Sequence, residues 1–206
     1  MDVSPRIKIC GITNVEDGLA AAEYGADAIG LVFYQKSRRY VTVEQATEIV
    51  HALPPFISVV GLFVDASDEL IQSVLDSVPL SLLQFHGNES ETECSRWGLR
   101  YLKAFRVRPD VPVEEMVAPY VSASGFLLDS YKPGEMGGTG ESFDWALIPR
   151  ELKKPVVLAG GLSPDNIAQA INRVRPYGVD VSSGVESQAG IKDHDKIKAF
   201  IKAAGR

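Results

Sequence analysis

The sequence has few of the residues that build disulfide frameworks and metal sites. Its 206 residues include two cysteines, Cys10 and Cys94, and three histidines at positions 51, 86 and 194. Two cysteines this far apart fit neither a disulfide-rich secreted domain nor a zinc-binding spacing, and the histidines show no metal-ligand pattern. We therefore expect no metal site, and we expect a reducing cytoplasm as the compartment.

Clustered positive charge and long apolar runs are also missing. The formal net charge is −6 and the sequence pI is about 5.1; the nearest approach to a basic cluster is the short stretch Lys36-Ser-Arg-Arg39. General nucleic-acid binding relies on clustered lysine and arginine, so we expect no nucleic-acid partner. No apolar run approaches the roughly 18 residues that a membrane span requires, and the N-terminus shows no apolar signal-peptide region. The expected partner is a small molecule.

The sequence does contain a regular alternation of short β-rich runs and longer stretches with helical periodicity. Its composition is that of an ordinary globular protein, with 45% hydrophobic residues and a mean hydropathy of zero. Strands are expected over residues 6–10, 28–33, 57–64, 81–85, 101–105, 125–128, 155–158 and 179–181. Helices or helical turns are expected over residues 15–24, 43–53, 68–77, 89–97, 113–120, 144–147, 163–174 and 193–203. Ser163 and Pro164 suit the N-cap and the first position of the helix that they open.

Eight strand–helix units in one chain predict the fold class. Such alternation requires a parallel sheet with right-handed crossovers, and eight units in 206 residues favour an α/β protein with a single (β/α)₈ barrel, the TIM-barrel architecture. A doubly wound open sheet is the alternative, but it usually carries Gly-x-Gly-x-x-Gly after the first strand. Here Cys10 is followed by Gly-Ile-Thr-Asn. No linker or low-complexity segment divides the chain, so we expect one domain over residues 1–206.

Two successive loops near the end of the sequence are rich in hydrogen-bond donors. Gly160 and Gly161 follow one expected strand and allow a ligand to approach the backbone closely, because neither carries a Cβ. Ser182, Ser183 and Gly184 follow the next strand and offer hydroxyl and amide donors at the start of a short helix. Donor-rich loops after the last two strands are typical of the phosphate site of such a barrel. Two ordinary strand–helix turns are the alternative interpretation.

Reactive side chains also fall at strand ends, where a barrel of this kind places its chemistry. Cys10 closes the first strand and points away from the side of Ile9 by alternation, although a buried cysteine is usually an inert hydrophobe. Asp129 follows an apolar run, where it could equally cap a loop. The same strand ends carry Arg38 and Arg39, Gln84 and His86, and Arg106. The residues alone support a phosphorylated substrate with acid–base chemistry at Cys10 and Asp129, and they leave open a nucleophilic cysteine partnered by His86.

A long glycine-rich loop, Gly134–Gly140, follows the sixth expected strand. It lacks the Gly-Lys-Ser/Thr ending of a nucleotide-binding loop. This composition suits a mobile lid over the mouth of the barrel. The alternative is a solvent-exposed loop without such a role.

Taken together, these motifs make the chain similar to phosphoribosylanthranilate isomerases of tryptophan biosynthesis. The resemblance runs in order over nearly the whole chain and is most specific in Lys-Ile-Cys-Gly and Ser-Arg-Arg-Tyr. Phe85 stands where family members often have leucine, a change between apolar residues. The matching stretches are Lys8-Ile-Cys-Gly-Ile-Thr, Gly30-Leu-Val-Phe-Tyr-Gln-Lys-Ser-Arg-Arg-Tyr, Val60-Gly-Leu-Phe-Val, Leu83-Gln-Phe-His-Gly, Leu127-Leu-Asp-Ser, Gly137-Gly-Thr-Gly, Leu158-Ala-Gly-Gly-Leu and Val179-Asp-Val-Ser-Ser-Gly-Val-Glu.

The resemblance implies an Amadori rearrangement of N-(5′-phosphoribosyl)anthranilate to 1-(2-carboxyphenylamino)-1-deoxyribulose 5-phosphate, without a metal or cofactor. It implies that Asp129 is the general acid, that Cys10 is the general base and that Arg39 holds the anthranilate portion. The phosphate would lie between the loop at Gly160 and Gly161 and the loop at Ser182, Ser183 and Gly184. The remaining substrate-binding residues that the resemblance implies are Gln84, His86 and Asp180.

Two other functions remain open from the sequence. One is the related isomerase of histidine biosynthesis, which places an aspartate on the first strand where this chain has Cys10. The other is a catalytically silent barrel that binds a phosphorylated ligand, although an intact acid and base speak against it. A monomer and a homodimer are both compatible with the sequence, because exposed apolar residues such as Phe56 do not distinguish them.

Overall fold

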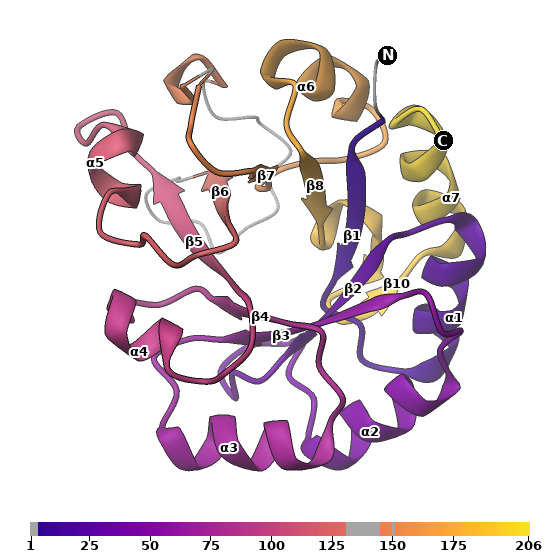
Figure 1. Ribbon diagram of the computed structural model, residues 1–206. Helices are drawn as coiled ribbons and strands as arrows, with labels where there is room; N and C mark the ends of the chain where they lie inside the picture. The colour runs from indigo at the N-terminus through magenta and orange to yellow at the C-terminus, as the bar shows by residue number, and fades with distance from the viewer. Residues whose placement is uncertain (1–3, 131–144, 150) are drawn as a thin grey trace.

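The computed structural model describes residues 4–130, 145–149 and 151–206 and has a closed barrel of eight parallel strands at its centre. Each strand pairs in parallel with the next, and β8 pairs with β1 to close the ring. The helices lie around the outside of this ring (Figure 1). The predicted (β/α)₈ barrel is therefore confirmed, and the open doubly wound sheet is wrong.

The eight barrel strands match the expected positions closely. They are β1 Arg6–Cys10, β2 Ala28–Val32, β3 Ser58–Phe63, β4 Leu82–Phe85, β5 Tyr101–Val107, β6 Gly125–Ser130, β7 Val156–Leu158 and β8 Gly178–Val181. The helices are α1 Val15–Tyr24, α2 Val43–Ala52, α3 Asp68–Ser77, α4 Glu91–Ser95, α5 Val113–Val117, α6 Ile167–Val174 and α7 His194–Ala203, with 3₁₀ turns η1 Trp145–Leu147 and η2 Ser183–Val185. A short hairpin, β9 Glu186–Gln188 and β10 Ile191–Lys192, follows η2.

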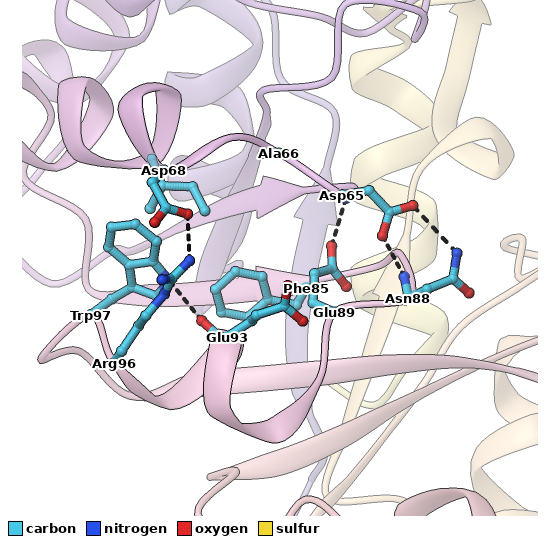
Figure 2. A pocket seen from close by; sticks show the side chains of 10 residues that line it. Asp65, Ala66, Asp68, Phe85, Asn88, Glu89, Glu93, Arg96 and Trp97 are labelled. Atoms are coloured by element: carbon cyan, nitrogen blue, oxygen red, sulfur yellow. Dashed lines mark hydrogen bonds and ion pairs between the residues drawn. The ribbon is translucent and has the colours of Figure 1, made fainter.

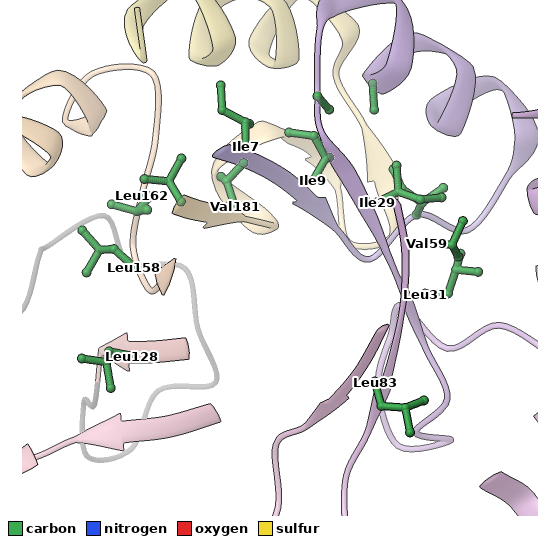
Figure 3. Close-up of a cluster of buried hydrophobic side chains, with 14 of the residues drawn as sticks. Ile7, Ile9, Ile29, Leu31, Val59, Leu83, Leu128, Leu158, Leu162 and Val181 are labelled. Atoms are coloured by element: carbon green, nitrogen blue, oxygen red, sulfur yellow. The ribbon is translucent and has the colours of Figure 1, made fainter. Parts of the chain in front are cut away.

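Alternation along the parallel strands divides the core into two layers. Ile7, Ile9 and Leu31 belong to the large cluster between the strands and the helices, part of which is drawn in Figure 3. The neighbouring positions point into the barrel, where Cys10 packs with Val32 in a separate small cluster. A second interior cluster is formed by Leu102, Ala104, Leu127, Val157 and Ala159. A polar residue on the Cys10 side of a strand therefore faces the interior of the barrel.

Local signals explain where most of the helices begin and end. Asn14 caps α1 by accepting a hydrogen bond from the backbone of Asp17, and Gly25 ends that helix in the left-handed conformation with φ 102°. Thr42 and Gln45 form a capping box at the start of α2. Such caps fix the length of each helix and hence the position of the following strand.

The start of α6 corrects the sequence prediction. Ser163 and Pro164 were expected to open this helix, but α6 begins at Ile167 with Asn166 as its N-cap. The Asn166 side chain accepts from the backbone N–H of Ser163 at 2.9 Å and donates to the carbonyl oxygen of Gly161 at 2.8 Å. These two bonds hold residues 163–166 as a turn that supports the loop after β7.

Three further differences concern element lengths and one missed hairpin. α4 and α5 are five residues each, shorter than the predicted ranges 89–97 and 113–120. The hairpin of β9 and β10 was not predicted, because its sequence Glu-Ser-Gln-Ala-Gly-Ile-Lys has no sustained β alternation. The expected lid, Gly134–Gly140, and residue 144 of the expected turn lie outside the described residues. Within the described ranges, no helix is long and apolar enough to cross a membrane.

Candidate active site

The predicted catalytic residues lie at the carboxyl ends of two strands and face the barrel interior. Cys10 ends β1 and is 5% exposed, while Ile9 beside it packs in the outer layer. Asp129 lies near the end of β6 and follows Leu128, which faces outward, by alternation. The strands β6, β7, β8 and β1 are consecutive in the ring. The two residues therefore lie on well-separated walls of the same mouth.

A buried ion pair lies directly next to Cys10. Lys8 Nζ is 2.8 Å from Asp180 Oδ1, and the side chains are only 7% and 9% exposed. Register explains the contact, since Lys8 on β1 is paired with Asp180 on β8. Burial lowers the pKa of Lys8, but the charges and hydrogen bonds of Asp180 and Cys10 together outweigh this effect, so the pKa is raised above its ordinary value. Lys8 is thus held as a cation inside the barrel.

The Cys10 thiol responds to both members of this pair. Burial raises its pKa, the charge of Lys8 lowers it, and the charge of Asp180 raises it again. The net result is a pKa above the ordinary thiol value of 9.0. At neutral pH the thiol is therefore mostly protonated, and the small thiolate fraction is a strong base.

Asp129 lies next to one predicted substrate-binding residue, His86, which in turn lies next to a second, Gln84. Its Oδ2 lies 3.5 Å from His86 Nε2, and His86 Nδ1 lies 3.4 Å from the side-chain nitrogen of Gln84. Gln84 is fully buried, and its Oε1 has no hydrogen-bond partner among the described residues. The row of Gln84, His86 and Asp129 forms a polar wall of the barrel and positions the carboxyl group.

Arg39 reaches back over the end of β1. Its stem covers Gly11, where a Cβ would collide with the Arg39 Cδ atom, and Gly11 has the positive φ of 74° that favours glycine. Its Nε and Nη2 atoms bind the two carboxylate oxygens of Glu186 at 2.7 and 2.8 Å. Lys192 Nζ binds the same carboxylate at 2.9 Å. Arg39 is therefore fixed at the rim close to Cys10 by the hairpin that the sequence did not predict.

The charges of this rim cluster influence one another. Burial raises the pKa of Glu186, but its bonds to Arg39 and Lys192 prevail and lower it. Burial lowers the pKa of Lys192, and the charge of Glu186 only partly opposes this effect. Neither Glu186 nor Lys192 was singled out from the sequence, because the contact with Arg39 spans 147 positions and no local pattern marks it.

The two donor-rich loops lie against each other. Gly160 and Gly161 adopt φ values of 85° and 64°, which only glycine reaches easily. Gly184 approaches the first loop so closely that a Cβ would overlap the carbonyl oxygen of Leu162. Ser182 contributes a buried hydroxyl that has no partner among the described residues. The left-handed glycines and the close loop contact bring backbone groups of two loops together, an arrangement that suits an anion.

A separate hollow of about 160 Å³ lies between the loops after β3 and β4 (Figure 2). None of the predicted site residues within the described part of the chain lines it. Its polar groups are paired with one another: Asp65 accepts from the backbone of Asn88, Glu89 accepts from the backbone of Asp65, and Asp68 pairs with Arg96. These bonds tie two loops together and leave no convergent polar groups for a ligand. No cluster of potential metal ligands occurs among the described residues.

Comparisons with known proteins give a consistent result. Residues 7–203 match the model of a family described as N-(5′-phosphoribosyl)anthranilate isomerase. The N-(5′-phosphoribosyl)anthranilate isomerase of Pseudomonas fluorescens strain Pf0-1 is 61% identical over 198 residues, which cover 96% of this chain and 97% of the relative.

Solved structures agree with the sequence relatives. The crystal structure of phosphoribosyl anthranilate isomerase from Thermotoga maritima superimposes with a TM-score of 0.90 at 45% identity, covering 97% of this chain and 98% of that one. A phosphoribosyl anthranilate isomerase in complex with reduced 1-(o-carboxyphenylamino)-1-deoxyribulose 5-phosphate gives a TM-score of 0.87 at 44% identity, with the same coverage of both chains.

Proposed function

The chain belongs to the N-(5′-phosphoribosyl)anthranilate isomerase family, and on this premise we propose that Cys10 is the general base and Asp129 the general acid of its reaction. The protein is an isomerase of tryptophan biosynthesis that acts on N-(5′-phosphoribosyl)anthranilate. The family therefore decides in favour of an enzyme over a silent ligand-binding barrel. We propose the cytoplasm as its compartment.

One observation carries the assignment of acid and base. Cys10 and Asp129 are reactive groups on separate walls of one barrel mouth, at the carboxyl ends of β1 and β6. The Amadori rearrangement needs a proton delivered to the furanose ring oxygen and a proton removed from C2′, the carbon next to C1′. Two groups on separate walls of one mouth suit these two proton transfers to a substrate held between them.

The reaction follows from this placement in two steps. Asp129 donates its proton to the ring oxygen, the C1′–O bond breaks, and the nitrogen lone pair forms the C1′=N double bond of a protonated Schiff base. The Cys10 thiolate then removes the C2′ proton, and the C–H electrons form the C1′=C2′ bond of an enolamine while the iminium nitrogen becomes neutral. The enolamine tautomerises to the aminoketone product.

Binding groups for the rest of the substrate lie around this pair. We propose that the phosphate binds between the loop at Gly160 and Gly161 and the loop at Ser182, Ser183 and Gly184. Arg39 uses Nε and Nη2 to bind Glu186, and we propose that its remaining nitrogen, Nη1, faces the anthranilate carboxylate. We assign Gln84, His86 and Asp180 to the walls that enclose the sugar.

Substitutions of the two reactive residues test the proposal. We expect Cys10→Ala and Asp129→Ala each to lower kcat by about 10²–10⁴-fold, the usual contribution of a general acid or base. The assay generates the substrate in situ and follows the loss of its anthranilate-type fluorescence. Binding of the reduced product analogue should persist in both variants, because the loops and Arg39 are intact.

The second cysteine provides the matched control. Cys94 is fully buried on α4, and burial raises the pKa of its thiol to about 12. Cys94→Ala should therefore retain turnover. Near-wild-type kcat in Cys10→Ala or in Asp129→Ala would reject the role of that residue.

A further inference from the structure

The pair of Lys8 and Asp180 has no part in the two chemical steps, although it lies at the centre of the barrel. Both side chains are more than nine-tenths buried. Burying two charges costs desolvation that their attraction repays only in good geometry, and apolar replacements of such pairs are often no less stable. Stabilisation of the fold alone therefore explains the buried pair of Lys8 and Asp180 poorly.

Gly30 shows how close Lys8 is to the thiol. A Cβ built on Gly30 of β2 would lie 2.8 Å from Cys10 Sγ and 3.0 Å from Lys8 Nζ. Because both distances are measured from the same point, Cys10 Sγ and Lys8 Nζ are separated by no more than about 6 Å. Within this range an opposite charge favours the ionised form of its neighbour. Because Gly30 has no side chain, the ammonium group and the sulfur can both approach the space that a Cβ would fill.

We propose that Lys8 is a positioning residue that acts through Cys10, with its ammonium group serving as the counter-ion of the thiolate that accepts the substrate proton. The proposal rests on the assignment of Cys10 as the base. Asp180 would hold Lys8 in place and would partly offset its charge. The thiolate would then be populated but would remain basic enough to remove a proton from carbon.

The other charges around Cys10 support the same assignment. Lys8 stands first among the groups that lower the pKa of the thiol, and Lys192 on β10 adds a smaller contribution in the same direction. Lys192 is itself bound to Glu186 of the hairpin, as is Arg39 of the loop after β2. Asp180 on β8 acts in the opposite direction. Lys8 is therefore the cation whose removal should change the thiol most.

The test measures the thiol directly. The chain has two cysteines, so a Cys94→Ala background leaves one isotopically labelled cysteine Cβ whose NMR shift follows the ionisation of Cys10. We expect Lys8→Met to raise the midpoint of the Cys10 titration, so that the thiolate fraction at neutral pH falls about tenfold or more. Arg6→Met is the matched control, because it removes one cation of the same strand whose partner is Asp27 near the surface. It should leave the midpoint where it is.

Turnover should change in parallel with ionisation. The rate through a thiolate base rises with pH up to the thiol midpoint, so the rising limb of the kcat profile should move to higher pH in Lys8→Met. At neutral pH kcat should fall, though by less than the thiolate fraction because the remaining thiolate is more basic, with KM little changed. A general structural defect would not shift the rising limb of the kcat profile by the same amount as the Cys10 midpoint in the NMR titration.

Asp180→Asn keeps the proposal testable if Lys8→Met does not fold. It frees Lys8 from its carboxylate, so the Cys10 midpoint should move down, opposite in sign to Lys8→Met. Equal midpoints in Lys8→Met and its parent would overturn the inference, and so would shifts of the same sign in both variants. If instead Cys10→Ala keeps full turnover, the assignment of the base itself has failed, whatever the titration shows.

Discussion

Replacing Gly184 by alanine tests the proposed phosphate site at its tightest point. The new Cβ would overlap the carbonyl oxygen of Leu162, and the backbone carbon of that residue and the Cα of Ser163 lie only 3.0 and 3.2 Å from the same position. Non-bonded heavy atoms prefer about 3.5–4.0 Å. The loops after β7 and β8 must therefore separate by about 1 Å or more, because no flexible side chain is available to yield.

The kinetic consequence follows from what the phosphate contributes. A displacement of about 1 Å in a positioning group can cost on the order of 10²-fold in kcat/KM. Phosphate contacts hold the ground state and the transition state alike, so most of this loss should appear as a higher KM and less as a lower kcat. The fluorescence assay with Gly184→Ala gives both constants, and inorganic phosphate as a competitive inhibitor should lose affinity in parallel.

Gly98→Ala separates this effect from the general cost of losing a glycine. Gly98 has a φ of 73°, and a Cβ there would meet nothing within 4 Å. It should cost stability through backbone strain and leave KM unchanged. If folded Gly184→Ala kept the KM of the parent and the same inhibition by phosphate, the assignment of these loops to the phosphate would be refuted.

Two further predictions concern charged groups. Arg39→Ala should raise KM far more than Lys36→Ala, because Arg39 lies over the end of β1 whereas Lys36 is exposed, and equal effects in the fluorescence assay would mean that the loop supplies charge in a general way. Glu89→Gln should lower the free energy of unfolding by about 3–5 kcal/mol, since the ammonium group of Lys103, which is 2% exposed, loses its opposite charge and keeps only the carbonyl oxygens of Gly87 and Phe85. Thermal denaturation should then show a Tm about 10 °C lower, whereas Asp68→Asn, in a half-exposed pair, should cost less than about 1 kcal/mol. A similar loss in both variants would contradict the burial argument.

Much of the barrel could be predicted from the sequence because its signals are local. Short apolar runs marked the strands, glycine or proline followed several of the helices, and residues that suit a cap, such as Asn14 and Thr42, precede the helix starts. The start of α6 was missed because the Asn166 side chain bonds to the preceding loop and so competes with the cap that Ser163 would form. A local rule cannot decide between two such arrangements when the deciding contact belongs to a neighbouring loop.

The candidate site was predicted less completely than the fold. Individual residues at strand ends could be named, since barrels place their chemistry there. Lys8 was also within reach of the sequence, because alternation puts it on the same side of β1 as Cys10. The pairing of Lys8 with Asp180 could not be predicted, because Asp180 lies 172 positions away and contacts Lys8 only through strand register. Glu186 and Lys192 were missed for the same reason.

Barrel closure explains why these omissions share one cause. β1 pairs with β8 only when the ring closes, and this pairing brings Lys8 to Asp180 and places Cys10 beside them. The contact of Arg39 with Glu186 likewise joins the first quarter of the chain to its last. Contacts of such large sequence separation close long loops, which costs more entropy than a local contact and slows folding. A chain with an unclosed ring would keep Lys8 and Cys10 together on β1 but would lack the contact with Asp180, so closure completes the charged surroundings of the proposed base.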